Sequence, residues 1–450
     1  MAPALRNPYL NRSMIRSVEE FHGRRREVAR LLSRMGARTP QSVSLVGERR
    51  MGKSSLLWHV AQPQVCAGHL AEPERYIFLY LDFQGHQYLD QGGFCRVFGE
   101  QLNAAAGGRI CVGTPADLSG IEAAAQGVDR AGLQLVCLLD EFETVTRNAA
   151  FGPEFYGALR SLANGYNVAY VTASRQHLQS LCHNQEISES PFFNIFAEVR
   201  VGAMPDSEVA ELIEGPSAAA GLPLVAHAAA IRHLGGNLPF FVQIACSSAF
   251  ECLQDAGGQG LDEARLERVF LEEAESHFQY LWGVFGEGER RALVELAEGG
   301  TAAGEVVAGL EEAGYVTVRE DAPRVFSEAF ARFVLEEAGR GRAAEPGAGP
   351  QAAPSPLPPA GEGGLVEGHR GLPEGRPGRT GDSHPGPGFL AVAGRPRRPS
   401  GPRPGPLPAG GGRPRPAGDP PLPAGRRRRG AAVAPRPQRR GRRRGHGEPR

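Results

Sequence analysis

The stretch VGERRMGKSS, residues 46–55, constrains the fold of this chain more than any other feature. It contains Lys53, the single lysine among 50 basic residues, all others being arginine. Lysine ends in a compact ammonium group, whereas arginine carries a broad planar fork. A chain that uses arginine everywhere else therefore needs lysine here for a geometric reason, and a tight loop of backbone amides supplies one.

The spacing around Lys53 indicates a phosphate-binding P-loop, G-x-x-x-x-G-K-S. A β-rich run (42–46) precedes it and a helical apolar pattern (54–61) follows, as such a loop requires. We expect Lys53 to reach the β/γ-phosphates and Ser54 to bind Mg²⁺. The expected nucleotide-binding residues of the loop are Gly47, Glu48, Arg49, Arg50, Met51, Gly52, Lys53, Ser54 and Ser55. A chance match in a glycine-rich chain is the alternative.

The segment LQLVCLLDEFE, residues 133–143, supplies carboxylates. Its apolar run (135–139) suits a central parallel strand buried on both faces. Asp140 and Glu141 follow at the carboxyl end, where open α/β sheets bind ligands. We predict Asp140 as a Mg²⁺ ligand and Glu141 as the catalytic group that polarises the attacking water. A solvated acidic loop is the alternative.

Other segments complete an α/β pattern. Three further runs are β-rich: residues 75–83, 167–172 and 196–201. Five such runs alternating with helical segments predict a parallel sheet with helices on both faces. Arg175 follows the fourth strand, where we expect it to contact the γ-phosphate as a third catalytic group with Glu141 and Lys53; an ordinary surface arginine is the alternative. Asp82 and Gln84 either approach the metal or cap the next segment.

Composition changes sharply near residue 340. Residues 341–450 hold 24 of the 37 prolines and 25 of the 60 glycines, which predicts a disordered tail. The tail has 21 arginines and 7 acidic residues, so its net charge is +14, and residues 1–340 carry −14. Its arginine clusters (426–429 and 439–444) would attract nucleic acid through charge. A linker, a solvated terminus and a shifted reading of GC-rich DNA are open alternatives for the tail.

Cysteine use and hydropathy bear on location. The seven cysteines are scattered and include no C-x-x-C pair, unlike a disulfide framework or a zinc site. No run approaches 18 apolar residues, and the first residues lack the apolar core of a signal peptide. We therefore expect a cytoplasmic protein without a membrane segment.

Five segments together resemble the bacterial STAND-type P-loop ATPases with an AAA-like or Orc1-like nucleotide-binding domain. They are FHGRRREVARLL (21–32), GERRMGKSSLL, LLDEFE, VTASR and GGNLPFFVQIAC, and the resemblance spans residues 18–338. It implies ATP or ADP as ligand with Mg²⁺, and contacts on the adenine side from Phe21, Gly23 and Arg24. It also implies that Pro239, in a helical lid, lies near the nucleotide. The family's G-x-P motif matches Gly236, Leu238 and Pro239 only if Asn237 is an insertion.

The segments after the sheet favour helices and a hairpin. Residues 207–214 begin with Ser207, a capping-type residue, and residues 239–253 follow with Pro239 in their first turn. Residues 277–335 look like a winged helix. The expected second helix of that unit (301–313) carries three glutamates and no basic residue, so it would repel nucleic-acid phosphates. We expect this unit to act as a lid.

These features together predict five regions and a function. The regions are an N-terminal extension (1–18), a P-loop ATPase domain (19–205), a helical lid (206–270), a winged helix (271–340) and the tail (341–450). We expect a slow, Mg²⁺-dependent ATPase that acts as a nucleotide-controlled switch in signalling or regulation. The alternative is an origin-recognition-like ATPase that binds nucleic acid through the winged helix and the tail. Self-association or a protein partner is compatible with either function.

Overall fold

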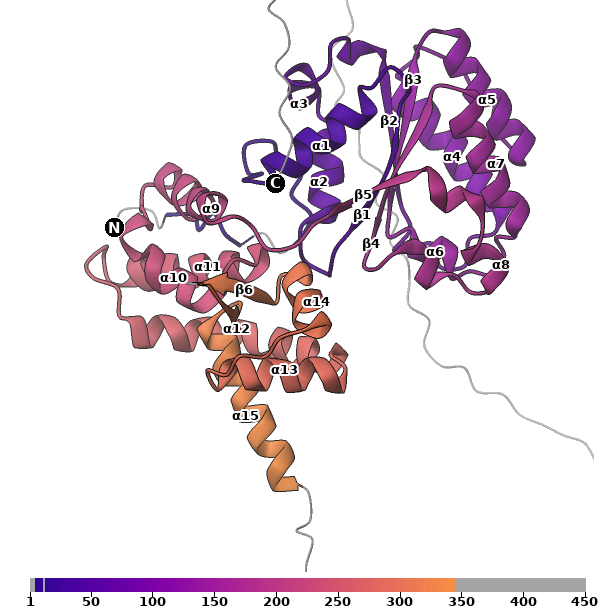
Figure 1. Ribbon diagram of the computed structural model, residues 1–450. Helices are drawn as coiled ribbons and strands as arrows, with labels where there is room; N and C mark the ends of the chain where they lie inside the picture. Colours follow the sequence, from indigo (N-terminus) through magenta and orange to yellow (C-terminus); the bar gives the residue numbers. More distant parts are fainter. Residues whose placement is uncertain (1–4, 11–12, 320, 345–450) are drawn as a thin grey trace, which may run out of the picture. The chain divides into compact units, whose positions relative to one another are not determined.

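A parallel sheet of five strands, in the order β2-β3-β4-β1-β5, forms the centre of the N-terminal half (Figure 1). This computed structural model describes residues 5–10, 13–319 and 321–344, all within one unit of the chain, Met1–Pro354. The strands are β1 (Ser42–Val46), β2 (Tyr76–Asp82), β3 (Gln134–Asp140), β4 (Val168–Ser174) and β5 (Phe196–Arg200). Each matches one of the five β-rich runs, so the predicted α/β class and parallel sheet are confirmed.

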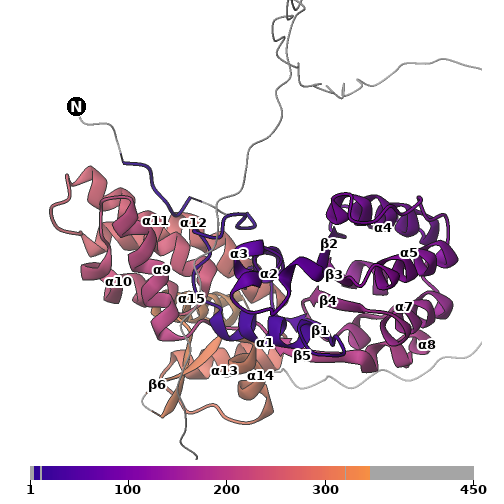
Figure 2. The same cartoon turned by 90° about the horizontal axis from the view of Figure 1, so that it is seen from above.

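Helices cover both faces of the sheet (Figures 1 and 2). One face carries α1 (Arg25–Met35), α2 (Lys53–Val60) and α3 (Pro63–Ala67); the other carries α4 (Gln91–Ala106), α5 (Leu118–Arg130) and α7 (Pro153–Gly165). Short helices α6 (Glu143–Thr146) and α8 (Gln185–Ser188) and the turns η1 (Pro73–Arg75), η2 (Leu178–Leu181) and η3 (Pro191–Ile195) lie in the connections. Parallel strands need such crossovers, which explains the two helical layers.

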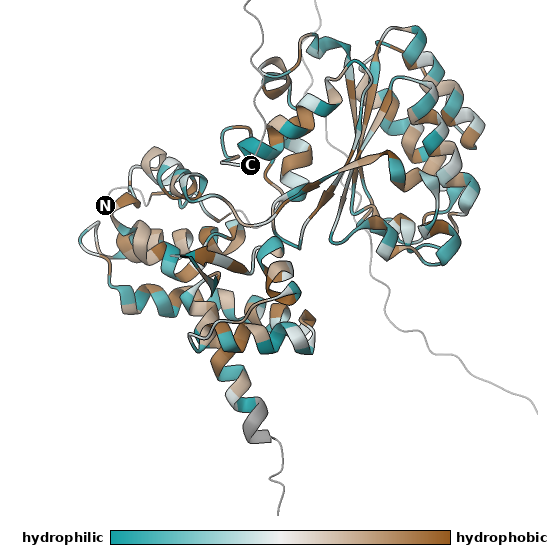
Figure 3. Cartoon of the chain, in the orientation of Figure 1, coloured by the Kyte–Doolittle hydropathy of each residue, from teal (hydrophilic) through white to brown (hydrophobic). Residues whose placement is uncertain are grey.

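The central strands are buried on both faces, which is why their sequences are apolar without alternation. On β3, Val136 and Leu138 belong to the core under α1 and α2. Leu135, Cys137 and Leu139 point the other way, into the core under α4, α5 and α7. In Figure 3 the strands are accordingly brown, whereas the outer helices carry hydrophilic residues among hydrophobic ones.

Helices dominate the rest of the described chain. They are α9 (Asp206–Ala219), α10 (Ala228–Gly235, after the turn η4 at Val225–His227), α11 (Pro239–Asp255) and α12 (Glu263–Val284). A C-terminal module follows: α13 (Glu287–Ala297), α14 (Glu305–Ala313), the antiparallel hairpin β6 (Val316–Arg319) and β7 (Ala322–Val325), and α15 (Glu328–Ala344). As predicted, Pro239 is the first residue of α11, and most of that helix is buried.

Three local expectations differ from the structure. Ser207 is not a cap: α9 begins at Asp206, and its N-cap residue is Pro205, whose side chain makes no capping bond. The helix expected from residue 301 begins only at Glu305, because Gly304 has a φ of +102°, which is not helical. Helix α15 runs to Ala344 and so passes the expected boundary at residue 340; the rest of the predicted disordered tail lies outside the described residues.

The structure also bears on the cysteines and on the hydropathy of the helices. All seven cysteines are free thiols, and burial raises the pKa of the Cys66 thiol to about 11. Among the helices that the structure describes, none combines the length and the apolar character that crossing a membrane requires.

The C-terminal module contacts the linker between β5 and α9, residues 201–205. Gly314 ends α14 with a φ of +89°, and a Cβ atom on it would lie 2.7 Å from the backbone nitrogen of Ala203. Arg200, at the end of β5, forms an ion pair with Glu312 at 2.5 Å. Close packing at Gly314 thus holds α14 against the linker, and the ion pair holds α14 against the end of β5.

We predict that Gly314→Ala destabilises the chain more than Gly299→Ala. Both glycines have a positive φ, +89° and +84°, so alanine at either costs about 1 kcal/mol in backbone strain. Nothing lies within 4 Å of a Cβ at Gly299, whereas Gly314 would also clash with the linker, for a total of about 3 kcal/mol. Thermal melting of the two variants tests this, and equal melting temperatures would contradict the packing described.

Candidate nucleotide-binding site

The loop between β1 and α2 is shaped by its two glycines. A Cβ atom on Gly47 would collide with the carbonyl oxygen of Val201, so only glycine allows the linker to approach there. Gly52 has a φ of +87° and is the N-cap residue of α2, and no atom lies within 4 Å of its Cβ position. This open space adjoins the N-terminus of an eight-residue helix, which attracts anions.

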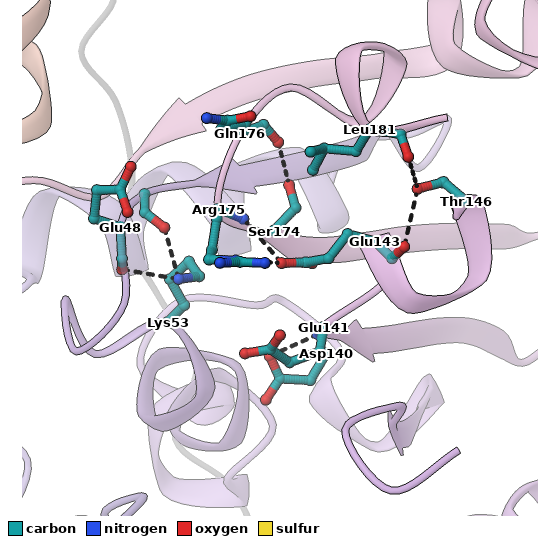
Figure 4. Close-up of polar contacts among 11 residues, drawn as sticks. Glu48, Lys53, Asp140, Glu141, Glu143, Thr146, Ser174, Arg175, Gln176 and Leu181 are labelled. Carbon is teal, nitrogen blue, oxygen red and sulfur yellow. Dashed lines mark hydrogen bonds and ion pairs between the residues drawn. The ribbon is translucent and has the colours of Figure 1, made fainter. Parts of the chain in front are cut away.

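Lys53 lies inside the loop, where it is 8% exposed. Its Nζ donates to the carbonyl oxygens of Gly47, at 2.6 Å, and of Glu48, at 2.9 Å (Figure 4). Burial lowers the pKa of Lys53, and the nearby carboxylates, Glu143 first among them, oppose that shift. A compact amine fits between two adjacent carbonyls, whereas a guanidinium fork does not.

Asp140, the last residue of β3, is a buried carboxylate with partners on both oxygens. Its Oδ2 accepts from the Tyr80 hydroxyl at 2.7 Å, and its Oδ1 accepts from the backbone N–H of Glu141 at 3.1 Å. Burial raises the pKa of Asp140, while hydrogen bonds from Ser54 and Tyr80 lower it. The Ser54 hydroxyl and the Asp140 carboxylate are therefore adjacent.

This pair fits a magnesium ion bound together with phosphate. The described residues contain no group of three or more His, Cys, Asp or Glu side chains arranged to hold a metal. Mg²⁺ in phosphate sites needs no such cage, because it keeps several waters and takes one or two protein ligands plus phosphate oxygens. A hydroxyl beside a carboxylate at the phosphate loop is a donor set of that kind.

Glu141 has a strained backbone. Its φ is +54°, in the left-handed region, which costs a residue with a Cβ atom about 1–2 kcal/mol. Burial, and then Glu143, raise the pKa of its carboxyl group. Strain of this kind persists where the surrounding structure imposes it, often at functional sites.

A cavity of about 480 Å³ joins these groups. Its lining includes most of the predicted residues, namely Phe21, Arg24, Arg49, Arg50, Met51, Gly52, Lys53, Ser54, Ser55, Asp82, Gln84, Asp140, Glu141 and Pro239. Other predicted residues do not line it: Gly23, Gly47, Glu48, Arg175 and Gly236. Asp82 and Gln84 therefore lie at the cavity, and the cap of α4 is Asp90 instead.

Arg24 connects the loop to the linker. It is 3% exposed, and its Nη2 donates to the carbonyl oxygens of Met51, at 2.9 Å, and Gly202, at 2.6 Å. Its backbone N–H donates to Glu208 of α9 at 2.6 Å. Gly23 precedes it with a φ of +76°, and a side chain there would collide with Met204. These two residues join the loop, the linker and α9.

Phe21 and Pro239 lie on the remaining sides of the cavity. The Phe21 ring stacks on His59, with centroids 3.9 Å apart. Next to Pro239, the Phe240 ring lies 4.0 Å from the guanidinium carbon of Arg50. Gly236 does not face the cavity, because it packs on the carbonyl oxygen of Phe326 in the C-terminal module. The glycine of the supposed G-x-P match thus has a packing role.

Arg175 follows β4 at the predicted edge of the sheet, but its side chain turns to Glu143. The Nε atom lies 3.4 Å from Glu143 Oε1, and the backbone N–H of Arg175 donates to the same oxygen at 3.3 Å (Figure 4). Sequence reasoning overlooked Glu143. The available signal was its position three residues after Asp140, in the acidic run that ends β3.

The N-terminal segment also lines the cavity, which the sequence did not indicate. Residues 13–16 contribute to the lining, and the backbone N–H of Ile15 donates to the Ser55 hydroxyl at 3.0 Å. The Tyr9 hydroxyl donates to the carbonyl oxygen of Ile213 in α9. This segment has no periodic pattern and no motif, so only its tertiary contacts reveal its position.

The fold and the loop define this chain as a P-loop NTPase. Residues 37–302 match the family described as Novel STAND NTPase 2. This match covers more than half of the chain, so the chain belongs to that family. The predicted resemblance to STAND-type P-loop ATPases with an Orc1-like domain is thereby confirmed.

Two solved structures share the fold. The Walker-type ATPase PABY2304 of Pyrococcus abyssi is 16% identical with a TM-score of 0.51, over 73% of this chain and 99% of its own. The ORC2 protein of Aeropyrum pernix, solved as ADPNP–ADP complexes, is 16% identical with a TM-score of 0.50. The match covers 76% of this chain and 99% of the ORC2 chain. No curated protein matches this chain.

We predict that Glu141→Gly yields a more stable nucleotide-free protein than Glu141→Gln. Glycine adopts a positive φ without strain, whereas glutamine keeps the left-handed cost, and the difference should be about 1 kcal/mol. Both changes remove the half-buried carboxylate, so charge does not contribute to the difference. Melting curves without nucleotide measure it; a less stable glycine variant would show that the loop does not store this strain.

Proposed function

We propose that this chain is a Mg²⁺-dependent ATPase that binds ATP and ADP, hydrolyses ATP slowly and uses the bound nucleotide as a switch in signalling or regulation. The observation that carries the proposal is the composition of one cavity. Phosphate-loop residues such as Lys53 and Ser54 line it together with Met204, Leu212 and Pro239, which lie in the linker, α9 and α11. A nucleotide bound there would contact both the sheet and the helices that follow it.

The proposed chemistry assigns each group one task. Lys53 and the N-terminus of α2 neutralise phosphate charge. Ser54 and Asp140 hold Mg²⁺, which lowers the negative charge on the phosphate oxygens. Glu141 orients the attacking water and accepts its proton, and burial favours this role because it raises the pKa of the carboxyl group and so makes the carboxylate a stronger base.

The proposed switch acts through the arginines of the loop. Arg50 stacks on Phe240 in α11, and the guanidinium carbon of Arg49 lies 6.0 Å from the ring centroid of Tyr280 in α12. Both arginines also line a second cavity of about 210 Å³, together with Tyr315 of the C-terminal module. A loop that changes shape with the bound nucleotide would therefore disturb aromatic contacts on α11 and α12 and shift the preferred arrangement of these helices.

We further propose the predicted regions 19–205, 206–270 and 271–340 as the ATPase domain, the helical lid and a winged helix that serves as a lid. The order α13, α14, β6, β7 supports the last assignment. Helix α14 carries Glu305, Glu311 and Glu312 and no basic residue, and Glu312 pairs with Arg200 of β5. This charge disfavours nucleic acid as its partner. A cytoplasmic location agrees with the free thiols.

We predict that Lys53→Ala and Lys53→Arg both abolish nucleotide binding. Alanine lacks the charge, and arginine keeps the charge but places a planar fork where two carbonyls accept one amine. Calorimetry with ADP and Mg²⁺ should show a loss of at least about 100-fold for each. Exposed Arg147→Lys is the control and should bind like wild type. Full binding by Lys53→Ala would place the phosphates elsewhere.

We predict that Glu141→Gln binds ATP but turns it over about 100-fold more slowly, because the amide cannot accept the proton of the attacking water. Phosphate release measures turnover. In this variant, hydrogen exchange of residues 201–205 and of α14 should differ between the ATP and ADP complexes. Identical exchange in both would contradict the switch while leaving the ATPase intact.

A further inference from the structure

Glu143 is a buried carboxylate to which the proposed chemistry gives no task. It is 3% exposed, and its Oε1 accepts both hydrogen bonds from Arg175. Its Oε2 is buried and has no hydrogen-bond partner among the described residues. An unpaired buried acceptor costs free energy, so stability alone does not explain a glutamate here.

Helix α6 holds Glu143 in a fixed place. The Thr146 hydroxyl lies 3.2 Å from the carbonyl oxygen of Glu143 and 3.3 Å from that of Leu181 (Figure 4). The backbone N–H of His183 donates to the carbonyl oxygen of Thr146 at 3.0 Å. Leu181 and His183 belong to the segment that follows Arg175. Helix α6 and the segment that follows Arg175 are therefore joined at two places.

The ion pair leaves the end of the Arg175 side chain available. Glu143 contacts only Nε and the main-chain nitrogen, and the two terminal nitrogens make no hydrogen bond with the described residues. The side chain is 28% exposed. Burial raises the pKa of Glu48 in the phosphate loop, and the charges of Lys53 and then Arg175 oppose that shift, so Arg175 lies near the loop. A guanidinium fixed through Nε presents its two terminal nitrogens as a pair that matches phosphate oxygens.

We propose that Glu143 is a positioning residue that fixes Arg175 through Nε and the main-chain nitrogen, so that the terminal nitrogens can contact the γ-phosphate of ATP. The proposal rests on the ATPase function proposed above. It makes the Glu143–Arg175 pair the part of the site that distinguishes ATP from ADP, because ADP lacks the γ-phosphate. Lys53 and Ser54, by contrast, serve both nucleotides.

Glu143 does not compete with Glu141 for the water. Glu141 lines the cavity, whereas the Glu143 carboxylate is buried and its Oε1 is already engaged with Arg175. If Glu143 were nonetheless the base, its substitution would slow turnover without changing the ratio of ATP to ADP affinity. The ratio of affinities therefore separates positioning from proton transfer.

The test measures binding of ADP and of a non-hydrolysable ATP analogue, with Mg²⁺, to the full chain. Arg175→Ala should weaken the analogue about 30-fold, the fold-change expected for lost hydrogen bonds to a charged group, and ADP by less than about twofold. Glu143→Ala should weaken the analogue about tenfold and spare ADP. The double variant should equal Arg175→Ala, because Glu143 acts through the arginine. Glu100→Gln, an exposed change on α4, is the control and should match wild type.

Glu143→Gln keeps the shape and an acceptor for the main-chain N–H, so it covers the case in which the alanine variant does not fold. It should reduce the preference for the analogue about threefold or more at an unchanged melting temperature. The inference is overturned if the ratio of the analogue's affinity to that of ADP stays unchanged in this variant, or if both affinities fall equally. It is also overturned if the effects of Glu143→Ala and Arg175→Ala add up in the double variant. If wild type binds and Lys53→Ala does not, such results defeat only this inference. A wild type that binds neither nucleotide defeats the proposed function as well.

Discussion

The contact between Gly47 and Val201 is the constraint on which the rest of the site depends. Strand β5 pairs with β1, and the backbone N–H of Val201 donates to the carbonyl oxygen of Val46 at 2.8 Å. The linker thus leaves the sheet directly against the start of the phosphate loop, and a side chain at Gly47 would prevent this. Arg24 also joins the loop to the linker, because its side chain donates to the carbonyl oxygen of Met51 in the loop and to that of Gly202 in the linker. A change in the loop cannot leave the linker unaffected, because the two share these contacts.

Strain is concentrated in the same region. The described residues other than glycine have a positive φ at four positions, and three of them, Arg24, Arg50 and Glu141, line the cavity. Each is held by neighbours: Arg24 by Glu208 and the two carbonyls, Arg50 by Phe240, and Glu141 by the strand before it. The free energy for this comes from well-packed strands such as β3, whose side chains fill both cores.

The sequence predicted those features of the structure that depend on a local pattern of residues. The apolar run before Asp140 and the spacing around Lys53 identified two strands, the loop and the edge of the sheet where they meet, because parallel strands bring their carboxyl ends together. It could not predict that Arg175 turns to Glu143, because that pair depends on how α6 packs on η2. Nor could it place Ile15 beside Ser55, which lies 40 positions further along the chain, because the N-terminal segment carries neither a periodic pattern nor a motif. Gly236 matched a motif in spacing but serves a backbone contact that only the tertiary structure contains.

The two cations of the site, Lys53 and Arg175, both have hydrogen-bond acceptors within the chain itself. Two loop carbonyls hold the Lys53 amine, and Glu143 holds Arg175. An incoming phosphate must compete with the carbonyls for the amine, so part of its interaction energy is offset, and affinity falls below what the bare charges suggest. Arg175 differs, because its terminal nitrogens can bind phosphate while Nε stays on Glu143. If Arg175 contacts the γ-phosphate as proposed, that contact breaks no existing bond, so the third phosphate would add its full contribution to the affinity.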